Sequence, residues 1–127
     1  MAKTTLRTFD IKRGRLQTSG AVTATLDIPV PTGSIMTYEA FINLGDISDG
    51  AGGAAGGHMA RIGAIKNAAE TVALIGADTA FFTDILSGTL ATATAVFTAN
   101  ATNLRLTVTG IAAIDIDWLY EIKTNIN

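Results

Sequence analysis

Residues 103–123, NLRLTVTGIAAIDIDWLYEIK, carry the clearest structural signal in this chain of 127 residues. Apolar and polar residues alternate in two runs, 104–109 and 114–123, which are separated by Gly-Ile-Ala-Ala. A period of two places successive side chains on opposite faces of a strand. The stretch therefore predicts a long antiparallel hairpin with a short glycine-containing loop. Its apolar row predicts five core residues: Leu106, Val108, Ile116, Trp118 and Tyr120.

The same alternation recurs upstream. It predicts further strands near residues 22–30, 35–47, 58–66, 71–77, 79–84 and 90–99. The strand at 35–47 has apolar residues in both of its rows, so a second sheet or another subunit is expected to cover it. A helix over 59–75 is the competing interpretation, because alanine, methionine, lysine and glutamate favour helices. Gly63, Gly76 and the β-branched residues favour two strands around a turn.

Seven to eight short strands at about ten-residue spacing predict an all-β fold, an antiparallel β-sandwich or a jelly-roll. The chain has room for one domain, which we place at residues 21–127. Residues 1–20 precede it and form either a first strand or an arm that reaches a partner. This segment holds most of the positive charge, and we consider its basic residues possible partner contacts: Lys3, Arg7, Lys12, Arg13 and Arg15.

The composition points to self-association. Charged residues make up only 16% of the chain, whereas 48% of its residues are hydrophobic. One small domain cannot bury so much apolar surface alone, so a homo-oligomer is expected. The net charge of −2 gives no electrostatic attraction to nucleic acid. Residues 85–104 carry no charge but are rich in threonine and asparagine, and they do not predict a membrane-spanning helix.

Residues 49–57, DGAGGAAGG, form a glycine-rich stretch between two ordered segments. A phosphate-binding P-loop would need a Gly-Lys-Ser/Thr ending, and His58 and Met59 stand there instead. Nothing around the stretch predicts the strand and helix that flank a dinucleotide-binding loop. Because ordering glycine costs much conformational entropy, we expect a loop that is flexible or ordered by a partner. His58, the single histidine, is expected to be an exposed side chain.

No catalytic or metal-binding constellation is expected. The stretch at 46–50 lacks the alternating oxygen ligands of a calcium loop. Asp115 and Asp117 share one strand face, where a solvated acidic row is the simpler interpretation than a metal site. Trp118 and Tyr120 alternate on the inward face, which favours core packing over sugar stacking. The sequence has no cysteine. We therefore expect neither an enzyme nor a cofactor.

The C-terminal stretch TNLRLTVTGIAAIDIDWLYEIK resembles the end of a loosely defined group of bacteriophage virion β-sandwich modules. In that group an alternating strand ending in glycine is followed by a strand that contains tryptophan. The upstream segments ARIGAI and TVALIG are laid out similarly, so the resemblance covers residues 58–123. Such modules occur in tail fibres, tail-associated proteins and head decoration proteins, typically as trimers. Residues 1–57 lie outside the resemblance.

The resemblance implies a non-enzymatic structural protein of a phage virion, located on the capsid surface or the tail. A head decoration protein is the leading hypothesis, because the chain is one compact domain without a shaft or repeat. It would be a homotrimer that binds the major capsid protein of the assembled head. A tail-fibre or receptor-binding protein is the first alternative. A carbohydrate-binding module is the second.

Overall fold

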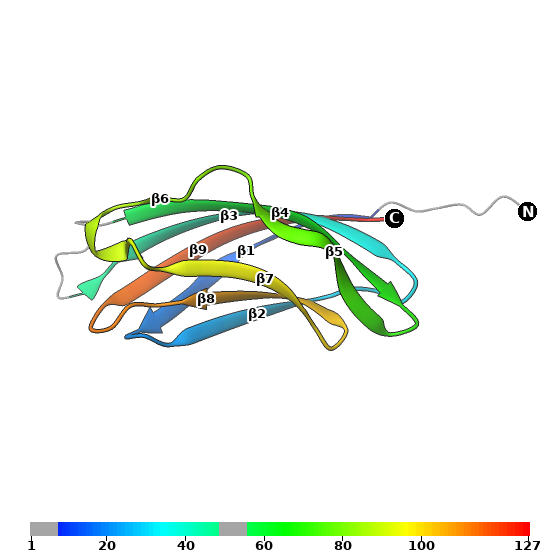
Figure 1. Ribbon diagram of the computed structural model, residues 1–127, viewed down its shortest axis with the longest axis horizontal. Helices are drawn as coiled ribbons and strands as arrows, with labels where there is room; N and C mark the ends of the chain where they lie inside the picture. The colour runs from blue at the N-terminus through cyan, green and yellow to red at the C-terminus, as the bar shows by residue number, and fades with distance from the viewer. Residues whose placement is uncertain (1–7, 49–55) are drawn as a thin grey trace, which may run out of the picture.

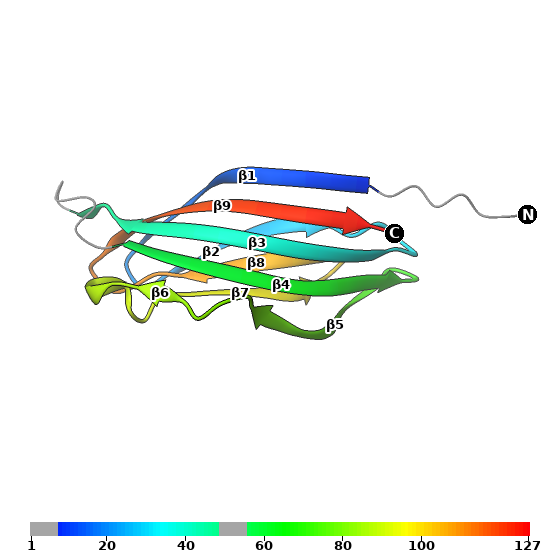
Figure 2. The same cartoon turned by 90° about the horizontal axis from the view of Figure 1, so that it is seen from above.

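The structure is a computed structural model that describes residues 8–48 and 56–127. In these residues nine strands form two antiparallel sheets that pack face to face (Figures 1 and 2). The all-β sandwich expected from the alternating pattern is confirmed. The competing helix over 59–75 is wrong, because these residues form the hairpin of two strands. Across the described ranges no helix has the length and apolar character needed to cross a membrane.

The strands differ in length, and the longest ones lie in the larger sheet. They are β1 (Thr8–Ser19), β2 (Thr23–Pro29), β3 (Ile35–Asp46), β4 (Gly56–Ala68), β5 (Thr71–Ala80), β6 (Ile85–Leu86), β7 (Thr94–Asn100), β8 (Asn103–Thr109) and β9 (Asp115–Ile126). One turn of 3-10 helix, η2 (Gly88–Leu90), precedes β7.

The large sheet has the strand order β1-β9-β3-β4-β5, with β6 paired to β4, and the small sheet has the order β2-β8-β7. The expected C-terminal hairpin is therefore wrong. β8 pairs with β2 and β7, whereas β9 pairs with β1 and β3. The loop between β8 and β9 crosses from one sheet to the other. The two apolar rows face each other across the sandwich instead of lying side by side.

The core is the apolar layer between the two sheets. Leu106 and Val108 from β8 are fully buried, and so are Ile116 and Trp118 from β9. Tyr120 is half-buried and packs against the same cluster. The indole Nε1 of Trp118 donates a hydrogen bond to the hydroxyl of buried Thr18 at 3.0 Å, so the one polar atom of the ring has a partner.

Two segments differ from their expected structure. Residues 79–84 do not form a separate strand: β5 continues to Ala80, and the chain then bends until β6 begins at Ile85. Gly56 and Gly57, expected in the glycine-rich loop, are the first residues of β4. The rest of that loop, residues 49–55, lies outside the described residues, and its expected flexibility stays a prediction.

Two tyrosines of the large sheet lie over glycines on the neighbouring strands. Tyr38 is paired with Gly63, and Tyr120 is paired with Gly14. A Cβ atom at Gly63 would lie 2.6 Å from Cζ of Tyr38, and one at Gly14 would lie 2.7 Å from Cζ of Tyr120. Both glycines therefore leave room for a ring to lie flat across the neighbouring backbone, which is a known way of covering glycine in a sheet.

The Gly63→Ala substitution tests this packing. Tyr38 is 2% exposed and cannot move aside, so we expect the free energy of unfolding to fall by about 1–3 kcal/mol. Gly45→Ala on β3 is the matched control, because a Cβ there meets no heavy atom within 4 Å. Urea denaturation of both variants measures the effect. Equal stabilities would show that the ring is not held against Gly63.

Candidate functional site on the outer face of the large sheet

The outer face of the large sheet, which points away from the small sheet, carries most of the exposed large apolar side chains among the described residues. The strand registers place side chains from β1, β9, β3, β4, β5 and β6 on it. Apolar side chains on this face that stay more than a third exposed are Phe9, Ile11, Ile35, Ile75, Ile85 and Leu119. Exposed apolar side chains gathered on one face of a protein indicate an interaction surface.

The corresponding face of the small sheet is polar. Threonine dominates it, and the exposed threonines are Thr23, Thr25, Thr94 and Thr98. At its centre Arg105 donates two hydrogen bonds to Asp27, at 2.8 and 2.9 Å. These hydrogen bonds hold the pKa of Asp27 below its usual range. The sandwich therefore has one polar broad surface and one that combines exposed apolar side chains with charged ones.

An aromatic cluster lies on the outer face beside β6. We define it as Phe41, His58, Phe81 and Phe82. The His58 ring stacks on Phe82 with centroids 5.1 Å apart, and it also lies nearly parallel to Phe41 at 6.3 Å. Phe81 meets Phe41 edge-on at 6.5 Å and remains 61% exposed. The imidazole Nδ1 of His58 pairs with the side-chain oxygen of Asn43. The single histidine is thus held in a stack and is half-buried.

Two aspartates anchor the segment that carries Phe81 and Phe82. At its start, Asp78 accepts hydrogen bonds from the hydroxyl of Tyr38, at 2.5 Å, and from the backbone N–H of Phe97, at 3.0 Å. At its end, Asp84 accepts two hydrogen bonds from the guanidinium of Arg61, at 2.6 and 2.8 Å.

The Arg61 anchor also connects the two sheets. Its Nε donates to the carbonyl oxygen of Ala95 on β7, at 3.1 Å. The Arg61 side chain is only 11% exposed, and the hydrogen bonds of its guanidinium with Asp84 raise its pKa. A bidentate pair of this geometry orients both side chains strongly. The two phenylalanines are therefore presented by a fixed segment.

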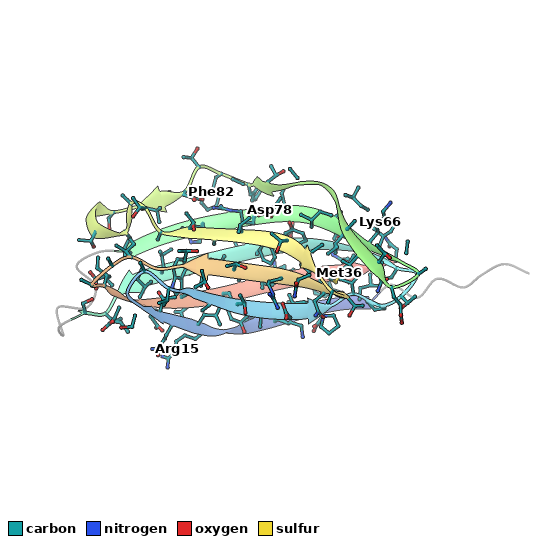
Figure 3. The ribbon with its side chains drawn as sticks, turned by 60° about the horizontal axis from the view of Figure 1, so that its bottom comes forward. Arg15, Met36, Lys66, Asp78 and Phe82 are labelled. Atoms are coloured by element: carbon teal, nitrogen blue, oxygen red, sulfur yellow. The ribbon has the colours of Figure 1, made fainter. Side chains whose placement is uncertain are left out.

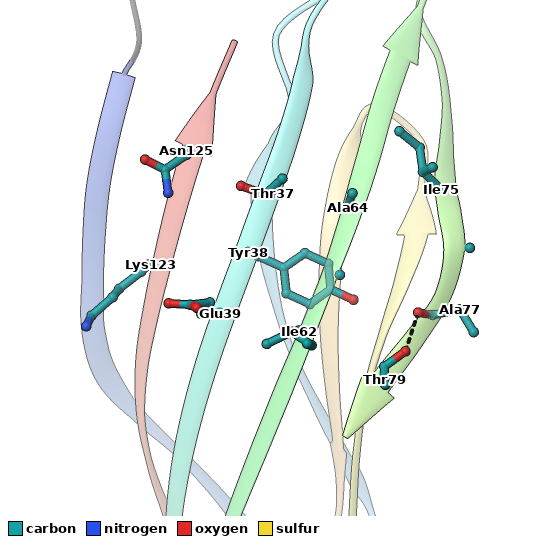
Figure 4. Close-up of a pocket in the computed structure, with 12 residues that line it drawn as sticks. Thr37, Tyr38, Glu39, Ile62, Ala64, Ile75, Ala77, Thr79, Lys123 and Asn125 are labelled. Carbon is teal, nitrogen blue, oxygen red and sulfur yellow. Dashed lines mark hydrogen bonds between the residues drawn. The ribbon is translucent and has the colours of Figure 1, made fainter. Parts of the chain in front are cut away.

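Two shallow depressions interrupt the outer face. The first, of about 620 Å³, lies over β9, β3, β4 and β5. Figure 4 shows Glu39, Lys123 and Asn125 on one side of it, and the apolar side chains of Ile62 and Ile75 on the other. Both polar and apolar groups are therefore available to a partner that enters this depression.

The second depression, of about 710 Å³, lies over β1, β9 and β3. Arg13, Arg15 and Glu121 form its polar part, and Phe41 and Leu119 form its apolar part. Arg13 donates to Glu121 at 2.8 Å, which lowers the pKa of that carboxyl group. The outer face thus offers apolar contact area beside strongly polar positions.

The basic residues predicted as partner contacts are not gathered in one patch. Lys3 and Arg7 lie outside the described residues. Arg13 and Arg15 project from the outer face of β1, where Arg15 is 3.3 Å from Asp117, and Figure 3 shows Arg15 extending from the body of the protein. Lys12 points to the opposite face of the same strand and lies 3.6 Å from Asp10.

The acidic residues weighed as metal ligands have protein partners. Asp115 accepts a hydrogen bond from the hydroxyl of Ser19 at 2.6 Å, and Asp117 contacts Arg15. Among the residues that the structure describes, no group of three or more histidine, aspartate or glutamate side chains could hold a metal ion.

No sequence pattern points to the contacts that Asp78, Arg61 and Asp84 make. Each partner is at least 19 residues away along the chain, so no local pattern connects them. One local signal was present: Phe81 and Phe82 are adjacent, and neighbouring residues of an extended chain cannot both face the core. At least one of them had to be on the surface.

The sequence matches no protein-family model and no curated protein. Among solved structures, the tailspike protein of Acinetobacter phage vB_ApiP_P1 is similar, with a TM-score of 0.44 and 15% sequence identity. The match covers 92% of this chain and 22% of the tailspike chain, so this chain spans about a fifth of that protein. Neither value is high enough to transfer a function from the tailspike to this chain.

Tyr38→Phe tests the Asp78 anchor through its pH dependence. Burial, and then the hydrogen bond to Asp78, raise the pKa of Tyr38. The folded state therefore keeps the neutral phenol, and the resulting stability is present below the unfolded tyrosine pKa of about 10 and declines as the pH rises above it. We expect Tyr38→Phe to be less stable at pH 7 by about 1–2 kcal/mol.

The difference in the free energy of unfolding between wild type and Tyr38→Phe should narrow as the pH rises from 9 to 11. The reason is that the variant has no phenol at this position to ionise on unfolding. Urea denaturation at several pH values in this range measures the gap. A gap that stays constant would mean that Tyr38 ionises as freely in the folded protein as in the unfolded chain.

Proposed function

We propose that this chain is a non-enzymatic structural protein of a bacteriophage virion, a capsid decoration protein that binds the assembled head as a homotrimer. The observation that carries the proposal is the outer face of the large sheet. A monomer leaves the exposed apolar side chains of this face in water, together with Phe81 of the aromatic cluster, whereas assembly with other subunits would cover them. The C-terminal resemblance over residues 58–123 supplies the phage context.

The pairing of the charged side chains supports a structural role. Asp27, Asp84, Asp117 and Glu121 each lie in a salt bridge with an arginine. General acid-base catalysis needs a group that can exchange a proton with a substrate, and a carboxylate held by arginine is poorly suited to this task. The single histidine, His58, has its ring stacked against Phe41 and Phe82.

Decoration would stabilise a capsid by mass action. A protein that binds only the assembled lattice stabilises that lattice relative to its separated subunits. The outer face suits this role because it is broad and mixes apolar area with the arginines of β1. Arg13 and Arg15 project from it and are 70% and 60% exposed, so they can meet acidic groups of the major capsid protein.

The first alternative, a tail-fibre or receptor-binding protein, uses the same fold at another place in the virion. A decoration protein binds empty capsids in large copy number, whereas a fibre protein binds cells or glycans. The second alternative, a carbohydrate-binding module, gains one supporting observation, because Phe81 offers an exposed ring beside the second depression. A glycan array tests it directly.

Leu119→Ser tests the outer face as the assembly surface. Leu119 is 50% exposed, so its replacement should leave the fold intact while it removes apolar contact area. We expect weaker trimer formation in native mass spectrometry and lower occupancy in co-sedimentation with empty capsids. Val96→Ser is the matched control, because Val96 is 43% exposed on the polar face of the small sheet. Equal effects of the two substitutions would contradict the assignment of the outer face.

A further inference from the structure

The strand β1 forms an edge of the large sheet, and only one of its two sides is paired. It pairs with β9 through twelve consecutive residue pairs without a bulge, and no other described strand pairs with it. Figure 2 shows β1 at the side of the large sheet, beyond the strands of the small sheet. A straight edge strand of this length offers a row of unpaired backbone N–H and C=O groups to another chain.

The other edges of the two sheets are obstructed. On β7 the N–H of Phe97 and the carbonyl of Ala95 are bonded to side chains of Asp78 and Arg61. The β5 edge is irregular, because its register with β4 shifts between Ile62 and Ala64. β2 ends in a proline, which has no N–H to donate. In the described part of the chain, β1 is therefore the edge best suited to strand addition.

The small sheet does not cover the first half of β1. Asp10 and Lys12 point to the same side of the large sheet as its core residues, yet their side chains are 52% and 42% exposed. Phe9 and Ile11 point to the outer face and are 58% and 38% exposed. Both faces of this half-strand are thus accessible, and a second strand can lie beside it without a steric obstacle from the small sheet.

We infer that β1 pairs with β1 of a second copy of this chain, antiparallel and in the register that places Ile11 opposite Ile11. In this register Asp10 of each copy lies opposite Lys12 of the other, so the two salt bridges within the strands become a group of four alternating charges. On the outer face the two Ile11 side chains meet, and each Phe9 lies opposite an Arg13, where a cation-π contact can form.

The charges of β1 select this register over its neighbours. A pairing centred on Lys12 places the two lysines opposite each other, and one centred on Asp10 does the same with the two aspartates. A pairing centred on Gly14 places Arg13 opposite Arg15. Like charges directly opposite each other destabilise a strand pair, whereas opposite charges stabilise it. Charged residues on an edge strand normally deter association, but this order of charges is complementary to itself.

The pairing would join two large sheets into one continuous sheet of ten strands, counted along the main paths β1-β9-β3-β4-β5. The inference goes beyond the proposed function and does not depend on it, since the contact needs neither a capsid nor a trimer. If the trimer exists, the same contact links neighbouring trimers across a twofold axis.

A charge swap tests the register. Lys12→Asp alone and Asp10→Lys alone each place like charges opposite each other twice in the dimer. We expect each to raise the dimer dissociation constant, measured by analytical ultracentrifugation, by about tenfold. The double variant Asp10→Lys/Lys12→Asp should restore dimerisation. Lys66→Asp, with the same change of charge far from β1, is the control and should leave the dimer unchanged. Circular dichroism verifies that each variant is folded.

Cysteine cross-linking gives an independent measurement, because the chain has no cysteine of its own. In the inferred register the Cα atoms of the two Ile11 residues lie about 4.5–5.5 Å apart, within the range of a disulfide. Ile11→Cys should therefore form a disulfide-linked dimer on mild oxidation. Ile35→Cys is the matched control, since Ile35 is 45% exposed on the same face but lies on a central strand.

Equal cross-linking of Ile11→Cys and Ile35→Cys, or a monomeric Ile11→Cys protein, overturns the inference. The outcome is separable from that of the proposed function. Capsid binding without Ile11 cross-linking would reject the β1 contact alone. Cross-linking without capsid binding would keep the β1 contact and reject the decoration role.

Discussion

The carboxylate of Asp78 is the interaction on which the sandwich and its candidate surface both depend. It accepts a hydrogen bond from Tyr38 on β3 and another from the backbone of Phe97 on β7, so it connects the two sheets. The Tyr38 and Phe97 rings pack with centroids 4.6 Å apart, directly beside these hydrogen bonds. The same contact keeps Tyr38 over Gly63, closes the edge of β7 and fixes the start of the segment that presents the aromatic cluster.

The sequence alone was sufficient to predict the fold class, because an alternating pattern determines which face of each strand is apolar. It was not sufficient to predict strand partners. The apolar rows that contain Leu106 and Trp118 are both buried. They would be buried equally well if the two strands were neighbours in one sheet or if they faced each other from two sheets. The structure has the second arrangement, so the predicted hairpin failed. A loop of five residues can make either connection, and nothing local distinguishes them.

The candidate surface was less predictable than the core for a related reason. Arg61 stands in the inward row of β4, and its partner Asp84 comes from a bend that the pattern assigned to a strand. His58 was expected to be solvated, and it lies between Phe41 and Phe82 instead. These contacts join residues that are distant in sequence, and they depend on how the chain folds back after β5. Alternation describes one strand at a time and carries no information about such contacts.

The chemical difference between the two broad faces limits how this protein can assemble. Threonines and the pair of Asp27 with Arg105 suit the small sheet to water, whereas Leu119 and Phe81 suit the large sheet to a partner. A subunit bound to a surface needs two different faces, because one is covered and the other is solvated. Pairing through β1 keeps the two faces of the sandwich distinct. A twofold axis perpendicular to the sheet keeps the outer faces of both copies on the same side, so a pair joined at Ile11 could present both outer faces to the same support.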